Sequence, residues 1–405
     1  EVVADPHAAT DPALEALPRS VAELPSYPWQ RERHAPSPAV EETPAQAEPG
    51  RAAVPAHRLR WQAAPAGTGE DPAGRTIALV GDDATALEEV LTAAHARGLT
   101  GHVLGPVATT ALPQGWSRGP LPSDGPVALV LAYAARPLPQ TADTGRDIAE
   151  EGARLCAAVT EEVRALAARG VPGDRAHVLT RASRRATGTE AVTAGPHGLL
   201  NGLAPALGLE LGGVWGGTVD LPADATPQDM SALLDHLLGG GGEDTAAVRE
   251  GTVLVPRVVT APDDYTPDLP VRPDATYLVT GGLGGVGRAI TEDLVGRGAR
   301  HLLLMGRRPK EALDDTATAF LERLGRDGVE AAYLSADCDA PAMVARASHA
   351  LDSLPALGGI VHCAGNLPHR PVAEVDADDF AAALRGKYSG TWWLHLLTRD
   401  HAPDF

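Results

Sequence analysis

A glycine-rich turn in the second half of the chain has the residue types and the spacing to bind a dinucleotide. Gly282, Gly284 and Gly287 follow the G-x-G-x-x-G pattern directly after a short apolar run. Such glycines let the backbone approach a pyrophosphate, which the N–H groups at the start of the next helix would bind. Because a predicted strand and a predicted helix flank the turn, we favour this interpretation over a glycine-rich turn without a ligand. The predicted cofactor contacts are Thr280, Gly282, Leu283, Gly284, Gly285, Val286 and Gly287.

The residues after this turn indicate the type of dinucleotide. An NAD site would carry a carboxylate about 20 residues after the motif, to bind the ribose 2′-hydroxyl. The chain has Arg307 at that place, followed by Arg308. A guanidinium there would pair with a 2′-phosphate through charge-assisted hydrogen bonds, so we predict NADPH, the alternative being an exposed basic strand end. Asp337 would bind the adenine amino group, and Ala364 and Gly365 would leave room for the nicotinamide ribose.

Lys387 is a candidate catalytic residue because the chain uses arginine almost everywhere else. Lys310 and Lys387 are the two lysines among 34 basic residues. A lysine kept in such a composition suggests that a compact ammonium with a readily shifted pKa matters at that place. Position 387 falls on a predicted helical stretch that continues through Trp392. The alternative interpretation is an incidental surface lysine.

These candidates need strands and helices to position them, and the sequence provides the patterns for both. Apolar runs over 277–279 and 301–305 lead into the glycine turn and to Arg307. Upstream, further apolar runs alternate with helical patterns over 84–96 and about 148–168. This alternation predicts an α/β protein with Rossmann-like, doubly wound parallel sheets. The apolar face of the helix after the turn is predicted to consist of Val286, Ala289, Ile290, Leu294 and Val295.

The first β-α unit of the chain has a turn of a different kind. The upstream strands are predicted over 57–61, 76–80, 127–131, 177–180 and 253–259, with a boundary near residue 265. Gly81-Asp82-Asp83 follows the second of these strands and places two carboxylates at a helix N-terminus. The carboxylates would compete with a phosphate for the positive end of the helix dipole. We therefore expect this unit to bind no nucleotide.

The overall composition excludes several classes of protein. With 53 acidic residues against 34 Lys and Arg, the net charge of −19 argues against a nucleic-acid or membrane partner. Three widely spaced cysteines support neither a disulfide framework nor a zinc or other metal site, so we expect a reducing, cytoplasmic compartment. No apolar run approaches the roughly 18 residues that span a bilayer. Position 1 is not Met, so we expect a piece cut from a longer polypeptide.

Taken together, these residues resemble the ketoreductase domain of modular type I polyketide synthases, within the short-chain dehydrogenase/reductase superfamily. The TGGLGGVG turn, Arg307-Arg308, Asp337 and Ala364-Gly365 match the family's NADPH-binding positions, and Lys387 matches its active-site lysine. The resemblance implies two Rossmann-like subdomains, the second C-terminally truncated. The implied segments are a post-acyltransferase segment with an Ala/Pro/Glu-rich linker (1–56), a structural subdomain that binds no cofactor (57–265) and an NADPH-binding catalytic subdomain (266–405).

The resemblance also implies a reaction and its partners. The family reduces the 3-oxo group of an acyl chain that phosphopantetheine tethers to an acyl carrier protein. Acyltransferase and ketosynthase domains belong to the same polypeptide. A Tyr protonates the alkoxide, a Ser binds the carbonyl oxygen and the Lys lowers the pKa of the Tyr. The Ser and Tyr positions would fall after Phe405, so we expect no NADPH-dependent turnover from residues 1–405 alone.

Two further points leave alternatives open. Leu367-Pro368-His369 stands where B-type ketoreductases have Leu-Asp-Asp, which favours an A-type product or a reductively inactive site. The alternatives to a synthase reductase are a free-standing NADP-dependent short-chain reductase and an inactive domain kept for structure or carrier docking. The intact turn, Arg307 and Lys387 favour catalysis, because a decayed site would not need to retain them.

Overall fold

The computed structural model describes most of the chain after residue 56. Within the described residues, no helix is both long and apolar enough to cross a membrane. The predicted linker (1–56), the boundary near residue 265 and Leu367-Pro368-His369 lie outside the described residues. The described ranges are 57–65, 75–104, 111–135, 144–188, 190–192, 195–239, 242–261, 269–340, 342–365 and 370–405.

The first sheet joins strands in the order β1-β9-β8-β7-β6-β5-β2-β3-β4. All neighbours from β8 to β4 are parallel, as predicted, whereas β9 pairs antiparallel with both β8 and β1. The sequence patterns did not predict this antiparallel edge. The strands are β1 (His57–Ala63), β2 (Thr76–Val80), β3 (Gly101–Leu104), β4 (Trp116–Arg118), β5 (Val127–Ala132), β6 (Arg175–Arg181), β7 (Trp215–Leu221), β8 (Thr245–Arg249) and β9 (Thr252–Thr260).

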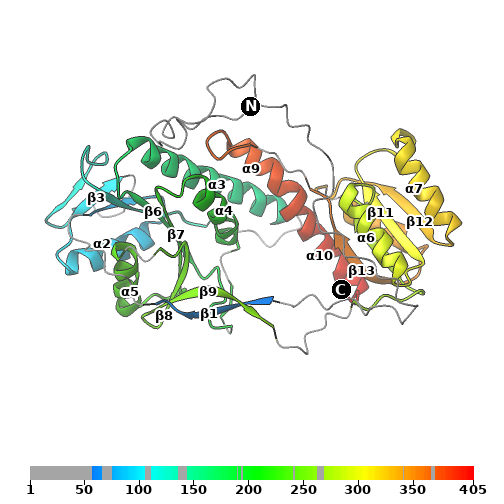
Figure 1. Cartoon of the computed structure of the whole chain (residues 1–405), viewed down its shortest axis with the longest axis horizontal. Helices are drawn as coiled ribbons and strands as arrows, with labels where there is room; N and C mark the ends of the chain where they lie inside the picture. Colours follow the sequence, from blue (N-terminus) through cyan, green and yellow to red (C-terminus); the bar gives the residue numbers. More distant parts are fainter. Residues whose placement is uncertain are drawn as a thin grey trace, which may run out of the picture. The chain divides into compact units, whose positions relative to one another are not determined.

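Helices cover both faces of this sheet (Figure 1). The helix predicted over 84–96 has those bounds, and the helix predicted over about 148–168 is longer at both ends. Helices α2 and α5 contribute to one buried apolar cluster, and α3 and α4 contribute to the cluster on the other face. The helices are α2 (Ala84–Ala96), α3 (Thr144–Arg169), α4 (His197–Glu210) and α5 (Pro227–Leu238).

The carboxylates of the first β-α turn have structural partners in the fold. Asp83 caps α2 by accepting a hydrogen bond from the backbone N–H of Ala86, at 3.0 Å. Asp82 accepts a hydrogen bond from the backbone N–H of Ala134 at 2.7 Å and pairs with Arg154 at 3.1 Å. Both side chains therefore stabilise the loop itself. That this unit binds no nucleotide stays a prediction.

A buried imidazole on β6 makes the stability of this sheet depend on pH. Burial, with nearby His236, Arg75 and Arg175 acting in the same direction, lowers the pKa of His177 to about 3. Unfolding returns the pKa to about 6.5, so the unfolded state binds more protons and stability falls as the pH drops below 6.5. One such site adds a slope of up to about 1.4 kcal/mol per pH unit. Urea unfolding at several pH values between about 6.5 and 5 measures how the free energy of unfolding changes with pH. This free energy should fall less steeply with decreasing pH for His177→Asn than for the wild type, and an equal pH dependence would contradict the prediction.

The second sheet contains the glycine turn and joins parallel strands in the order β12-β11-β10-β13. Two apolar clusters bury its two faces, one with α6 and α7 and the other with α8 and α10. The elements are β10 (Thr276–Thr280), α6 (Gly285–Gly296), β11 (His301–Gly306), η3 (Lys310–Ala312), α7 (Asp315–Arg326), β12 (Glu330–Ser335), α8 (Ala342–Leu351), β13 (Leu357–His362), α9 (Ala377–Leu384), η4 (Arg385–Ser389) and α10 (Gly390–His401).

The buried face of α6 differs in part from the predicted one. Leu294 is buried as expected, and Ile290 and Val295 pack partly buried against the core. Val286 is 70% exposed and Ala289 is exposed as well, so the predicted places of both on the apolar face were wrong. The side of α6 that faces the core runs instead through Gly287, Thr291 and Leu294, which are all buried.

Candidate functional site

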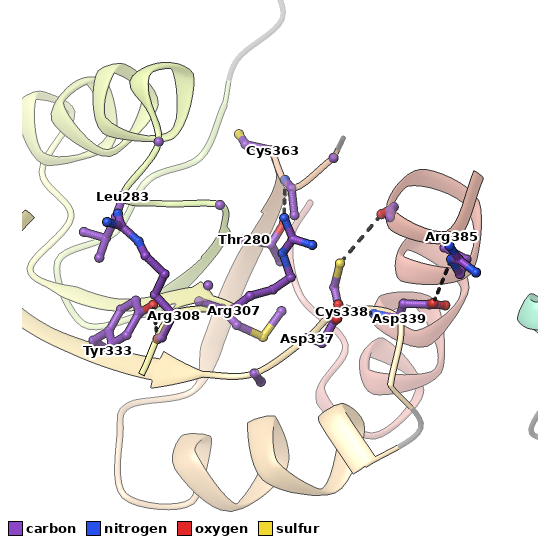
Figure 2. A pocket seen from close by; sticks show the side chains of 18 of the residues that line it. Thr280, Leu283, Arg307, Arg308, Tyr333, Asp337, Cys338, Asp339, Cys363 and Arg385 are labelled. Carbon is purple, nitrogen blue, oxygen red and sulfur yellow. Dashed lines mark hydrogen bonds and ion pairs between the residues drawn. The ribbon is translucent and has the colours of Figure 1, made fainter. Parts of the chain in front are cut away.

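A cavity of about 500 Å³ lies at the carboxyl ends of β10, β11, β12 and β13 (Figure 2). The carboxyl ends of parallel strands are where ligands bind in open α/β sheets. The described residues that line the cavity are Thr280, Gly281, Leu283, Gly284, Met305, Gly306, Arg307, Arg308, Tyr333, Ala336, Asp337, Cys338, Asp339, Cys363, Ala364, Gly365, Ala382, Arg385 and Gly386.

The glycine turn forms one wall of the cavity and needs glycine for two separate reasons. Gly281 has φ +66°, a left-handed conformation, and a methyl group there would lie 2.9 Å from the backbone nitrogen of Ala364. A methyl group on Gly287 would lie 2.2 Å from the carbonyl oxygen of Gly281. Gly284 is the N-cap of α6 and provides no capping side chain, so the first N–H groups of the helix are left for another acceptor.

The two arginines after β11 differ in their partners. The Arg308 guanidinium pairs with Asp314 at 2.6 Å, which raises the pKa of Arg308, and its carbonyl accepts a hydrogen bond from Tyr333. Arg307 has no ion-pair partner among the described residues, and Figure 2 shows its side chain extending toward Thr280. Arg307 is therefore the arginine that has its charge available to a ligand.

Lys387 lies at a local change of helix type that sequence reasoning did not predict. The predicted continuous helix is interrupted by a π-helical turn, Arg385–Ser389, between α9 and α10. Single π turns in α-helices are rare and frequent at functional sites. The turn brings the Lys387 side chain against Gly365, where a methyl group would lie 2.4 Å from Lys387 Cε and 3.0 Å from Nζ. The absence of a side chain at Gly365, which lines the cavity, thus leaves room for the ammonium beside it, whereas Lys387 itself is not among the lining residues.

The comparison with known proteins shows what the C-terminal third of the chain is similar to. A family model described as the KR domain matches residues 275–405. This segment is a KR domain. The KR domains of polyketide synthases are oxidoreductases of a superfamily that uses NAD(P)H. The match begins just before β10 and covers the second sheet and its helices.

Curated relatives of the chain are polyketide synthases. The 5-methyl-1-naphthoate synthase of Streptomyces sahachiroi is 35% identical over 275 residues, which cover 63% of this chain and 15% of that protein. A 6-methylsalicylic acid synthase of Arthrobotrys oligospora is 29% identical over 319 residues, 74% of this chain and 17% of that protein. The chain therefore spans less than a fifth of the length of these relatives.

Solved ketoreductase structures share the fold of the chain. An A1-type ketoreductase superposes with a TM-score of 0.64 at 24% identity, covering 86% of this chain and 72% of that one. An A-type ketoreductase from a modular polyketide synthase gives a TM-score of 0.61 at 24% identity, with 86% and 73% covered. These likenesses confirm the predicted α/β fold with Rossmann-like parallel sheets.

The KR domain brings most of the predicted site residues together. Lys387 lies against Gly365, and Gly282 and Gly287 pack inside the turn, where added methyl groups would meet neighbouring atoms. Gly285 and Val286 begin α6, with Val286 exposed. The predicted residues that line the cavity are Thr280, Leu283, Gly284, Arg307, Arg308, Asp337, Ala364 and Gly365.

Sequence reasoning missed several residues of the cavity wall. Cys338 and Asp339 directly follow Asp337, and the Cys338 thiol donates to the Gly386 carbonyl at 3.7 Å. Arg385 lies on the π turn, with its Nε 4.0 Å from Asp339. Proximity in sequence to Asp337 and Lys387 was the one available signal for these residues, because nothing in the sequence indicated that the two segments meet.

The close packing of the glycine turn allows a matched test of its stability. A methyl group at position 287 would overlap backbone atoms of Gly281 and Gly282, whereas one at position 285 meets nothing within 4 Å. We expect Gly287→Ala to lower the free energy of unfolding by about 2–3 kcal/mol. Gly285→Ala should leave it unchanged or raise it by up to about 1 kcal/mol, because alanine favours the helix. Chemical unfolding of both variants checks this, and equal stabilities would contradict it.

Proposed function

We propose that the KR domain binds NADPH in this cavity and reduces the 3-oxo group of an acyl chain carried by an acyl carrier protein. The observation that carries the proposal is the joint placement of two cations at the carboxyl ends of the strands. Arg307 lies at the end of β11 without an ion-pair partner among the described residues, and the Lys387 side chain lies against Gly365. NADPH carries a 2′-phosphate at one end, which Arg307 would bind, and a reactive nicotinamide ring at the other end, which would lie near Lys387.

The residues around the cavity can each be assigned to a part of the bound NADPH in this proposal. The uncapped N–H groups at the start of α6 would bind the pyrophosphate, and Arg307 would bind the 2′-phosphate. Asp337 would accept a hydrogen bond from the adenine amino group. NADPH, when bound, supplies the hydride. The Lys387 ammonium would orient the ribose beside Gly365 and stabilise negative charge that develops on the carbonyl oxygen.

The proposed partners follow from the relatives and not from the site itself. Both relatives are synthases several times longer than this chain, so we propose that the KR domain works within a polyketide synthase. The partners would be a carrier protein with its phosphopantetheine-tethered chain, and acyltransferase and ketosynthase domains of the same polypeptide.

One observation favours a second candidate, a nucleotide-binding element without turnover. Among the described tyrosines, Tyr333 is the one that lines the cavity. Its hydroxyl donates to the carbonyl of Arg308 at 2.8 Å, away from Lys387 and Gly365. Tyr388, the neighbour of Lys387, does not line the cavity, and its hydroxyl lies near Gly195. Among the described residues, no phenol is therefore seen beside Gly365 in position to protonate a substrate.

A binding assay and an activity assay together separate the two candidates. Fluorescence titration should show that the 405-residue chain binds NADPH. A synthase that carries the chain should oxidise NADPH in the presence of the 3-oxobutanoyl thioester of pantetheine, with the 3-hydroxy product identified by chromatography. Binding without product in the synthase would support the second candidate, and absence of binding would contradict both.

A further inference from the structure

We propose that His362 is a positioning residue that fixes the Lys387 turn relative to the glycine turn, and that it does so as a neutral imidazole protonated on Nε2. The proposal rests on the function proposed above, because it assigns His362 a role in placing Lys387. His362 is the last residue of β13 and is half-buried behind the cavity wall. Its ring lies between two elements that are more than 100 residues apart in sequence.

The ring makes one hydrogen bond to each side of the site. Its Nδ1 lies 2.6 Å from Oγ1 of Thr280, the residue that ends β10 and begins the glycine turn. Its Nε2 lies 2.9 Å from the carbonyl oxygen of Gly386, the residue before Lys387 in the π turn. His362 therefore links the proposed cofactor-binding turn directly to the turn that carries the ammonium.

The partners of the ring assign the hydrogen on Nε2 and, for a neutral ring, the remaining protons in this chain of contacts. A carbonyl oxygen can only accept, so Nε2 carries a hydrogen and donates it to Gly386. In the neutral ring Nδ1 then accepts, which requires the Thr280 hydroxyl to donate to it. The Thr280 oxygen in turn accepts from the backbone N–H of Ala364 at 3.2 Å. All the donors and acceptors are satisfied without a charged imidazole.

The surroundings of the ring also favour its neutral form. Burial lowers the pKa of His362, and the Lys387 ammonium acts in the same direction against the raising effect of the Gly386 hydrogen bond. The other titratable groups beside these contacts are Cys363, the next residue in the chain, and Cys338, whose thiol also donates to the Gly386 carbonyl. Burial raises the pKa of both thiols, so they are neutral neighbours.

The π turn has little freedom to move independently of His362. A methyl group on Gly390, at the start of α10, would lie 3.2 Å from His362 Cε1 and 3.1 Å from Cys338 Sγ. On the other side of the turn, a methyl group on Gly365 would lie 2.4 Å from Lys387 Cε. Loss of the Nε2 hydrogen bond would let the turn shift between these contacts, and a shift of about 1 Å at a reacting group can cost about 100-fold in rate.

The tautomer of His362 can be determined on the wild-type 405-residue chain by a measurement that does not require enzymatic turnover. Nitrogen-15 NMR of the histidine side chains at neutral pH, with His362→Gln used to assign the resonance, reports which ring nitrogen carries hydrogen. We expect one proton, on Nε2. A proton on Nδ1, or on both nitrogens, would overturn the proposal whatever the chain binds or reduces.

Two substitutions test the positioning role in the synthase. The side-chain nitrogen of glutamine can reach the place of Nε2, whereas that of asparagine corresponds to Nδ1. We expect His362→Asn to lower kcat for thioester reduction by about 10–100-fold, with the KM for NADPH changed less than about 3-fold. His362→Gln should restore much of the rate. His349→Asn, whose side chain is 92% exposed on α8, is the matched control.

The outcomes separate this proposal from the proposed function. If the wild-type synthase reduces no thioester, the proposed function fails while the NMR result still decides the tautomer. If the wild type is active and His362→Asn matches it, the positioning role is wrong. Equal losses in both variants with a lower melting temperature would indicate a structural role alone and would also overturn the proposal.

Discussion

Replacing Lys387 by methionine is expected to lower the rate of NADPH-dependent thioester reduction by about 100–1000-fold. Methionine keeps the length of the side chain that packs against Gly365 and removes the ammonium. The interaction between the ammonium and the substrate oxygen strengthens as negative charge develops on that oxygen in the transition state. Removal of one preorganised group of this kind typically lowers the rate by about this factor. The loss should appear in kcat, because the groups proposed to bind the phosphates are untouched. Steady-state kinetics of the synthase measures it.

Lys310→Met is the control for this experiment. Lys310 is the other lysine of the chain and lies exposed on the short η3 helix between Arg308 and α7. Its substitution changes the net charge by the same amount, and unlike Lys387 it does not lie against Gly365. We expect less than about a 2-fold change in rate, since isolated surface charges contribute little. Similar losses in both variants would mean that Lys387 acts through net charge or folding and not at the site.

Arg307→Ala is expected to weaken NADPH binding by about 10–100-fold while changing NADH binding by less than about 3-fold. Hydrogen bonds to charged groups contribute about 1.5–3 kcal/mol, and NADH has no 2′-phosphate with which to make them. The guanidinium of Arg307 has no ion-pair partner among the described residues, so its loss leaves no protein carboxylate unpaired. Fluorescence titration of the 405-residue chain with each dinucleotide measures the ratio.

Arg308→Ala provides the comparison within the same loop. Its guanidinium already pairs with Asp314, which also caps α7. Binding of a phosphate by Arg308 would have to break or share that pair, so we expect a smaller loss of NADPH affinity than for Arg307→Ala. The opposite order would assign the 2′-phosphate to Arg308. Equal affinities of the wild type for NADPH and NADH would contradict the cofactor assignment altogether.

Much of the fold could be predicted from the sequence because its signals are local. The apolar run before Gly281, the G-x-G-x-x-G spacing and the helical period of α2 each depend on residues within about one element, and the structure contains all of them. The same locality explains why Arg307 and Asp337 could be placed at strand ends. The carboxyl ends of parallel neighbours in one sheet necessarily meet.

The errors in the prediction also have a local explanation. Val286 and Ala289 fit the apolar period of α6, but the buried side of the helix includes a glycine and a threonine, Gly287 and Thr291, which a period of apolar residues does not count. β1 pairs antiparallel with β9 at the edge of the sheet, and the two strands lie far apart in the chain. A sequence window contains no information about which distant strand will pair with it.

The sequence by itself determined the β-α alternation, the glycine turn and the residue types at the strand ends, because those depend on propensity, period and spacing. The tertiary structure alone decided that Arg308 is paired and Arg307 is not, and that α9 and α10 meet through a π turn. It also decided that His362 joins Thr280 to Gly386. These features depend on contacts between segments far apart in the chain, where packing and hydrogen-bond satisfaction override local preference.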